Sequence, residues 1–149
     1  MSKKLNLEII SQEAKLLDEA VDMVLAPTVM GQIGILPGHI SLFTILKAGE
    51  LILVTGPYYD IFAVTGGFLN VNQDKITVLA DSAIKARDID IKKVEQAKLK
   101  AQEAMKQKLS ERDFKVAESD LRKAILNLKV AKRRRHSKHH SSNLQRQSL

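Results

Sequence analysis

The residue types that most often carry chemistry are sparse and poorly clustered in this sequence. Three histidines stand at positions 136, 139 and 140, and a fourth, His39, lies in a segment rich in glycine and proline. Three imidazoles without a fixed carboxylate give at best a weak, nonspecific site for a divalent metal. An isolated histidine in such a loop is more often a hydrogen-bonded turn residue than a proton carrier. We therefore predict no metal site and no proton relay.

Two further patterns lack the residues that would complete a reactive site. The glycines at positions 31, 34 and 38 are not followed by the Gly-Lys-Ser/Thr of a phosphate-binding loop. Asp81 has no histidine, serine or second carboxylate at a catalytic spacing. The sequence contains no cysteine, which excludes disulfides, thiolate ligands and thiolate nucleophiles. We predict no catalytic residues, and a protein that is not an enzyme.

The positive charge of the chain is concentrated at one end. The formal net charge is +7, and no acidic residue follows Asp120. Six of the seven charges are contributed by Lys132, Arg133, Arg134, Arg135, Lys138 and Arg146. The remainder is nearly neutral, and with 44% hydrophobic but only 4% aromatic residues its core must be built mainly from aliphatic side chains. No apolar run approaches the length of about 18 residues that a membrane span needs, and the N-terminus lacks the pattern of a secretory signal.

The distribution of glycine and proline divides the chain into two architectures. All seven glycines and all three prolines lie between Pro27 and Gly67. Over this half, short apolar runs are separated by turn residues, and Gly56-Pro57 and Asn72–Lys75 have the spacing of hairpin turns. No helical pattern of useful length lies between these runs. We predict an antiparallel β-sandwich of about ten short strands over residues 1–86.

The second half carries helix formers in steps of three and four. Asp90 can cap a helix that begins near Ile91, and Ser110–Asp113 resembles the capping box of a second helix. Both helices have a narrow, alanine-rich apolar stripe, so we predict an antiparallel helical hairpin over residues 87–135. Its burial contributes roughly a few kcal/mol at about 25 cal/mol per Å², which would let the hairpin detach. Residues 136–149 have almost no apolar surface and are predicted to form a disordered basic tail.

Three motifs of the first half carry a specific resemblance. The segments Gly31–His39, Phe62–Phe68 and Ile76–Ala83, followed by a helical hairpin, are similar to the ε subunit of bacterial F-type ATP synthases over about residues 4–131. This resemblance implies a noncatalytic subunit of the central stalk, whose sandwich couples the γ subunit to the c-ring during ATP synthesis. It also implies that the hairpin inhibits ATP hydrolysis. The implied location is the cytoplasmic face of the bacterial plasma membrane, where association is peripheral and indirect.

The resemblance implies two sets of partner contacts. The rotor-docking loop toward γ and the c-ring comprises Gly31, Gln32, Gly34, Pro37, Gly38 and His39. Position 32 is glutamine here, where acids are common in relatives. The second helix of the family can extend toward the α and β subunits, and its basic residues would be attracted to an acidic loop there. We assign these regulatory contacts to Arg122, Lys123, Lys129 and Arg133.

Some bacterial relatives bind ATP in the folded hairpin through an Ile-Asp-x-x-Arg-Ala pattern. This chain has Ile89 and Asp90, then Lys93 where the pattern has arginine, and Lys100 at the next basic position. Lysine supplies a point charge and not a planar, bidentate donor, so the change alters phosphate recognition. No cofactor is expected, and ATP is left open as a regulatory ligand.

A protein of another class is the main alternative, and it is suggested by the basic tail. In that alternative, the chain is a stand-alone basic binding module whose tail engages nucleic acid or an anionic membrane. The tail contains no phenylalanine, tyrosine or tryptophan on which bases could stack. We therefore expect no nucleic-acid partner.

Overall fold

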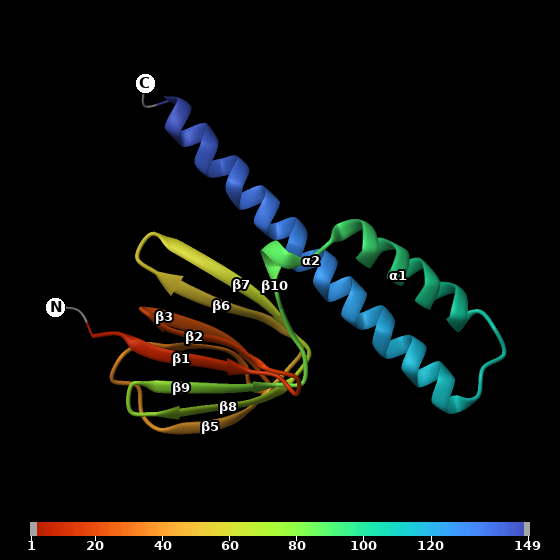
Figure 1. The fold of residues 1–149 in the computed structure, drawn as a ribbon, viewed down its shortest axis with the longest axis horizontal. Coiled ribbons are helices and arrows are strands. Elements are labelled where there is room, and N and C mark those ends of the chain that lie inside the picture. The colour runs from red at the N-terminus through yellow and green to blue at the C-terminus, as the bar shows by residue number, and fades with distance from the viewer. Residues whose placement is uncertain (1–2, 148–149) are drawn as a thin grey trace. The chain divides into compact units, whose positions relative to one another are not determined.

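The computed structural model describes residues 3–147, and it describes the side-chain surroundings of residues 3–133. The chain forms two compact units, residues 1–85 and 86–149. Figure 1 shows that the first unit is made of strands and the second mainly of two helices. The division falls one residue before the boundary that the sequence suggested.

The first unit is a β-sandwich, as the sequence predicted. Its strands are β1 (Leu5–Ile10), β2 (Lys15–Val21), β3 (Met23–Thr28), β4 (Gly31–Ile35), β5 (Leu42–Leu46), β6 (Gly49–Thr55), β7 (Tyr58–Val64), β8 (Gly67–Asn72), β9 (Lys75–Ala80) and β10 (Ala83–Lys85). Hydrogen bonds connect them in the order β10-β7-β6-β3-β5-β8-β9-β1-β2, with β4 beside β3. The strands fold into two packed layers (Figure 1).

Both hairpin turns that the sequence indicated are present. Thr55 pairs with Tyr58 across Gly56-Pro57, where Gly56 has a φ of 58°. Asn72 pairs with Lys75 across a second two-residue turn, in which Gln73 has a φ of 55°. Such turns need positive φ, and glycine adopts it without steric cost. These two turns set the register of β6 with β7 and of β8 with β9.

One strand pair differs from the predicted antiparallel arrangement. β1 runs parallel to β9, and Leu7 is aligned with Ile76 and Ile9 with Val78. The two strands are far apart in the sequence, so no turn sequence joins them and none could predict their pairing. The parallel pair joins the first strand of the sandwich to one of its last.

The core of the sandwich is aliphatic. Its fully buried side chains alternate along the strands with more exposed ones, as in Leu5, Leu7 and Ile9 of β1. Large side chains from other strands are Ile35, Leu51, Leu53, Leu69 and Ile76. Phe62 is the aromatic member of this cluster. The low aromatic content therefore does not prevent a continuous core.

The second unit is the predicted helical hairpin. It contains a short 3₁₀ helix, η1 (Ala86–Asp88), followed by α1 (Ile91–Met105) and α2 (Glu111–Gln147). The Asp90 carboxylate accepts hydrogen bonds from the backbone N–H groups of Lys92 and Lys93, at 3.1 and 3.3 Å, which confirms the predicted N-cap. At the start of α2, the Ser110 hydroxyl accepts from the Asp113 N–H at 3.2 Å. α1 and α2 lie side by side (Figure 1).

The C-terminal end of α2 differs from the prediction. The helix continues to Gln147, whereas the sequence suggested a hairpin that ends at 135 and a disordered tail over 136–149. No glycine or proline follows Gly67, so nothing in the sequence terminates the helix, and lysine, arginine and glutamine have good helix propensity. Positions 148 and 149 of the predicted tail lie outside the described residues.

Candidate functional site

The predicted docking loop is divided between a strand and a turn. Gly31, Gln32 and Gly34 belong to β4, while Pro37, Gly38 and His39 form the turn that follows it. Gly31 and Gly38 have φ values of 108° and 84°, so each needs the freedom of glycine. The Gly38 N–H donates to the Asp74 carboxylate at 2.9 Å, which attaches this turn to the β8–β9 turn. The loop is a fixed end of the sandwich.

His39 is a turn residue in the structure. Its backbone N–H donates to the Leu36 carbonyl at 3.1 Å, and its ring Nδ1 lies 2.7 Å from the carbonyl oxygen of its neighbour Ile40. Both contacts are local. This geometry agrees with the hydrogen-bonded turn role that the sequence favoured over proton transfer.

Six apolar side chains form a surface that the sequence did not identify. Ile45 on β5 is paired with Phe68 on β8, Phe68 with Leu79 on β9, and Leu79 with Ile10 on β1. At the other end, Val29 follows Thr28, which is paired with Leu46, so Val29 lies opposite Ile45. The Phe43 ring stacks on Phe68 with centroids 5.7 Å apart. We call this set the apolar row: Ile10, Val29, Phe43, Ile45, Phe68 and Leu79.

The apolar row lies on the outer face of the sandwich. Its members adjoin fully or nearly fully buried residues on the inner face, such as Ile9, Leu69 and Val78. Ile10 is half-buried, and the other five are exposed, from 45% for Phe68 to 66% for Phe43. Adjacent apolar side chains across several strands are unusual for an outer face, and exposed apolar patches are typical of interaction surfaces.

Gly67 lets strand β8 approach β9 closely beneath this surface. It has a φ of 132°, and a Cβ atom there would lie 2.0 Å from the Leu79 carbonyl oxygen. The carbonyl of its neighbour Gly66, which also has a φ of 132°, accepts a hydrogen bond from the Asp81 N–H at 3.0 Å. The two glycines therefore have a steric role, because they permit this close approach, and Asp81 is a turn residue.

The sequence missed the apolar row because its members come from separate strands. Each looks ordinary alone, as single exposed apolar residues are common. A local signal was nevertheless present, because Phe43 and Ile45 alternate with Leu42, Thr44 and Leu46, which makes both faces of β5 apolar. Only the register of the strands shows that these outward side chains are neighbours.

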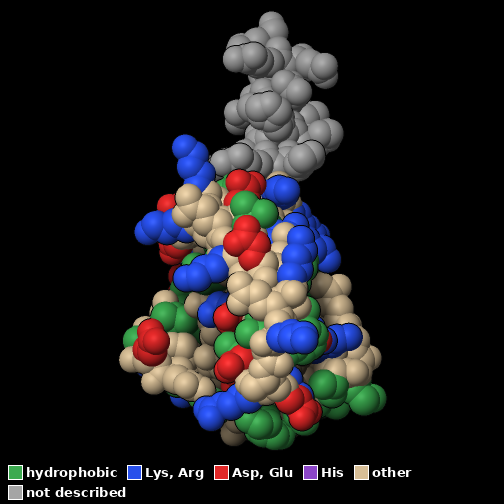
Figure 2. Space-filling model, turned by 90° about the vertical axis from the view of Figure 1, so that its right-hand side faces the viewer, with side chains coloured by type: hydrophobic (Ala, Val, Ile, Leu, Met, Phe, Trp, Pro, Cys, Tyr) green, Lys and Arg blue, Asp and Glu red, His purple; other side chains and the backbone are tan. Residues whose placement is uncertain are grey.

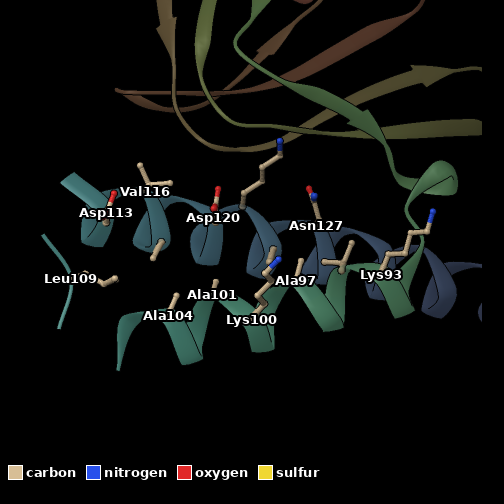
Figure 3. Close-up of a pocket in the computed structure, with 14 residues that line it drawn as sticks. Lys93, Ala97, Lys100, Ala101, Ala104, Leu109, Asp113, Val116, Asp120 and Asn127 are labelled. Carbon is tan, nitrogen blue, oxygen red and sulfur yellow. The ribbon is translucent and has the colours of Figure 1, made fainter. Parts of the chain in front are cut away.

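A groove of about 640 Å³ separates parts of α1 and α2 in the helical unit. It contains two of the four residues predicted for ATP, Lys93 and Lys100, together with Lys123 and Asn127 of α2. Figure 3 shows Ala97, Ala101 and Ala104 directed from α1 toward α2. The floor is therefore apolar. Outside the groove lining, Asp90 caps α1, and Ile89 is buried with 9% exposure.

The basic residues predicted for regulation do not form one cluster. Arg122 is paired with Glu118 one turn earlier on α2, and Lys123 lines the groove. Lys129 and Arg133 are exposed on the following turns. On the face shown in Figure 2, basic and acidic side chains are interspersed. The positive character of the described part of α2 is thus moderate.

Two ionic clusters stabilise the turns of the sandwich. The Lys4 ammonium lies 2.5 Å from the Asp22 carboxylate, which also accepts from the Gly56 N–H at 2.6 Å. The hydrogen bond from Lys4, followed by that from Gly56, lowers the pKa of Asp22. Lys15 lies 2.8 Å from Glu8 and 3.3 Å from Asp18, and these contacts raise the pKa of Lys15. The lysine of each cluster is exposed, so water partly screens both clusters.

The described residues offer neither clustered metal ligands nor a helix that could span a membrane. Within that part of the chain, no group of three or more histidine, aspartate and glutamate side chains is arranged to hold a metal ion. The histidines at 136, 139 and 140 are not covered, since their side chains lie outside the described residues. Neither α1 nor the described part of α2 is long and apolar enough to cross a membrane.

Comparison with known families matches both units. Residues 4–86 match the β-sandwich domain of the ATP synthase delta/epsilon chain, and residues 87–132 match its long α-helix domain. The chain belongs to the ATP synthase delta/epsilon family. Its relatives include the ATP synthase epsilon chain of Herpetosiphon aurantiacus, 45% identical over 88% of this chain and 96% of the relative. The epsilon chain of Dehalococcoides mccartyi is 42% identical over 89% and 95%.

Solved structures agree with this assignment. A chain of the Euglena gracilis mitochondrial ATP synthase, in a complex of OSCP, F1 and c-ring, has a TM-score of 0.67 and 25% identity, covering 79% of this chain and 75% of that chain. A chain of the Tetrahymena thermophila central stalk and c-ring has a TM-score of 0.59 at 14% identity, covering 87% and 98%, which shows the shared fold. Membership of this family favours an epsilon subunit over a stand-alone basic module.

Proposed function

We propose that this epsilon subunit is a noncatalytic coupling element of the rotor, whose sandwich binds the γ subunit through the apolar row. The observation that carries the proposal is the continuous apolar surface across neighbouring strands. A rotor contact must persist through every turnover, and permanent interfaces are more apolar than transient ones. The docking loop from Gly31 to His39, fixed at one end of the same unit, contacts the c-ring.

The energetics support a stable contact. Complete burial of a valine, leucine, isoleucine or phenylalanine side chain contributes about 1.5–3 kcal/mol relative to full exposure. Five members of the apolar row are roughly half exposed, so each gains about 1 kcal/mol when a partner covers it. A contribution of this size favours long-lived docking, after the cost of association has been met.

The docking proposal is tested by placing a charge in the apolar row. Phe68→Glu puts a carboxylate between Ile45 and Leu79, where a partner would have to desolvate it. We expect affinity for purified γ subunit, measured by isothermal titration calorimetry, to fall by about tenfold or more. Tyr58→Glu is the matched control, because Tyr58 is exposed to 77% on the β6–β7 hairpin. Unchanged affinity in folded Phe68→Glu would overturn the proposal.

The hairpin supplies the regulatory part of the proposed function. α1 contributes Ala101 as its buried residue, and alanines line the groove beside α2. Such a thin interface means that little burial free energy is lost when helix α2 separates from helix α1. Helix α2 can then extend toward the α and β subunits of the catalytic complex. In that position α2 inhibits ATP hydrolysis, and Arg122, Lys129 and Arg133 meet acidic groups of the partner.

The inhibitory role has a direct test. Removal of residues 86–149 should raise the ATPase rate of the assembled catalytic complex while the sandwich still binds the rotor. The purified full-length chain alone should show no hydrolysis of ATP. A truncated subunit that assembles but leaves the ATPase rate unchanged would show that the hairpin does not inhibit ATP hydrolysis.

We also propose ATP as a regulatory ligand of the groove between α1 and α2. The support is that three lysines from two helices, Lys93, Lys100 and Lys123, line one apolar-floored groove, together with Asp113 and Asp120 of α2. ATP bound there would hold α1 against α2 and so oppose extension. We expect ATP to protect both helices from amide hydrogen exchange, and Lys100→Ala to remove that protection. No protection at millimolar ATP would exclude this regulatory ligand.

The proposed location follows from the proposed partners. As part of the F1 central stalk, the subunit is peripheral to the membrane, and in a bacterium it lies on the cytoplasmic face of the plasma membrane. Fractionation should find it with the membranes through its complex. Removal of the c-ring and γ subunit should release it.

A further inference from the structure

The tip of the β3–β4 hairpin presents a methionine to solvent. Met30 is 88% exposed, the largest fraction among the large hydrophobic side chains of the described residues. Of the other methionines, Met23 and Met105 are half-buried, and Met1 lies outside the described part of the chain. An apolar side chain that is this exposed contributes almost no burial free energy to the fold of its own unit.

Hydrogen bonds hold this tip in one conformation. The Thr28 hydroxyl, whose residue is only 2% exposed, accepts from the Met30 N–H at 3.2 Å and donates to the Gly31 carbonyl at 2.6 Å. The Val29 N–H donates to the Ile45 carbonyl at 3.1 Å, which attaches the tip to β5. Met30 is therefore exposed because these hydrogen bonds fix the conformation of the turn.

Met30 adjoins the proposed rotor contact. Its neighbour Val29 forms one end of the apolar row, so a partner that covers the row comes up to the hairpin tip. Gly31, the first residue of the docking loop, follows on the other side. A flexible thioether at such a point can adapt to an irregular partner surface.

A thioether differs from other apolar side chains in its reactivity with peroxides. The sulfur lone pair attacks one oxygen of hydrogen peroxide, the O–O bond breaks, and the products are methionine sulfoxide and water. Sulfur is oxidised by two electrons and the peroxide is reduced by two. The sulfoxide is polar and accepts hydrogen bonds, so its burial against an apolar partner requires desolvation.

We propose that Met30 is an oxidation-sensitive contact between this subunit and the rotor. In the free chain, hydrogen peroxide oxidises Met30 before the other described methionines, and the resulting sulfoxide weakens docking. In the assembled rotor, the partner shields the same sulfur. The inference rests on the proposed docking function and adds to it a modification site that acts on assembly.

The first experiment measures where oxidation occurs. The purified chain is treated with increasing hydrogen peroxide, digested with trypsin and analysed by mass spectrometry. Cleavage after Lys15 and Lys47 leaves Met23 and Met30 in one peptide, so fragment ions must locate the added oxygen. We expect Met30 to react several-fold faster than Met23 and Met105 in the free chain, and to be protected in the complex with γ and c-ring. Equal rates, or no protection on assembly, would overturn the proposal.

The second experiment measures the consequence for binding. The affinity of oxidised chain for the solubilised γ–c-ring rotor should fall by about tenfold, the cost of one desolvated polar group, and methionine sulfoxide reductase should restore it. Met30→Leu keeps an apolar side chain of similar size that peroxide does not oxidise, so its affinity should not respond to peroxide. Met23→Leu is the matched control, and it should remain sensitive.

The outcomes separate this inference from the docking proposal. If Phe68→Glu abolishes binding while oxidation of Met30 has no effect, the apolar row docks the rotor and Met30 is not a contact. If oxidation weakens Met30→Leu as much as the unaltered chain, the effect arises elsewhere and the inference is wrong. If Phe68→Glu has no effect but Met30 oxidation does, docking occurs at the hairpin tip and not through the row.

Discussion

The sandwich packs large aliphatic side chains together, whereas the apolar residues of the groove between the helices are mainly alanines, and under the proposed function this difference separates a permanent contact from a switch. In the sandwich, fully buried leucines and isoleucines from many strands form one cluster. Between the helices, alanines such as Ala101 and Ala124 line a groove that remains partly open. Because burial free energy scales with apolar area, we expect the contact between the helices to be easier to rearrange than the core of the sandwich.

Removal of a core side chain should show the largest difference between the two units. Leu69 is fully buried in the middle of β8, so Leu69→Ala should lower the free energy of unfolding by about 2–5 kcal/mol. The measurement is urea denaturation of the full chain. Ala124→Gly on α2 is the comparison and should cost only about 1 kcal/mol. Equal losses would mean that the hairpin is held as firmly as the sandwich.

Gly67→Ala probes the backbone of the sandwich. The new Cβ would collide with the Leu79 carbonyl at a φ of 132°, so we expect a loss of about 2 kcal/mol or more in unfolding free energy. Gly56→Ala is the matched control, because Gly56 has a positive φ of 58° but, apart from its own residue and its two chain neighbours, no heavy atom within 4 Å of the point where its Cβ would lie. Thermal melting compares the two. A milder effect at Gly67 than at Gly56 would contradict the close strand approach.

Filling the groove should make the hairpin more like the sandwich. Ala97 is exposed and lines the groove, so Ala97→Leu adds apolar contact there and should stabilise the hairpin by about 1 kcal/mol. Slower amide hydrogen exchange in α1 and α2 would report this gain. The stabilised hairpin should also inhibit ATP hydrolysis less, because extension becomes harder. Faster exchange would show that the groove does not accept added volume.

The smallest expected effect is the pH dependence of the Asp22 contacts. Because the folded-state pKa of Asp22 is lowered, its contribution to stability is present above the unfolded pKa, near about 4, and is lost as the pH falls through the folded pKa. The melting temperatures of the unaltered chain and Asp22→Asn should therefore differ at neutral pH and converge in acid. A difference in melting temperature that grows as the pH falls would contradict a lowered folded-state pKa of Asp22.

The sequence predicted most of the fold because its signals are local. Gly56-Pro57 marks a turn, and Asp90 caps a helix, through chemistry confined to a few neighbouring residues. The parallel pairing of β1 with β9 was missed because it joins distant segments. The continuation of α2 to Gln147 was missed because a basic composition lowers the expected burial without lowering helix propensity.

The candidate sites were less predictable because their residues come from segments that are distant in the sequence. Lys93 and Lys100 were identified only through the resemblance to relatives that bind ATP, and both line the groove. Phe43, Phe68 and Leu79 become one surface only through strand register, which the sequence does not display. The glycines of residues 31–39 marked a turn, and the resemblance gave that turn its predicted docking role, whereas the apolar row has no such markers.

If the sandwich alone carries rotor docking, the hairpin is dispensable for binding. The decisive quantity is the affinity for purified γ subunit of residues 1–85, a unit with its own core, compared with that of the full chain. We predict equal affinities within about twofold, a difference of less than about 0.5 kcal/mol at about 1.4 kcal/mol per tenfold change. A folded fragment that binds about tenfold or more weakly would show instead that docking requires the hairpin.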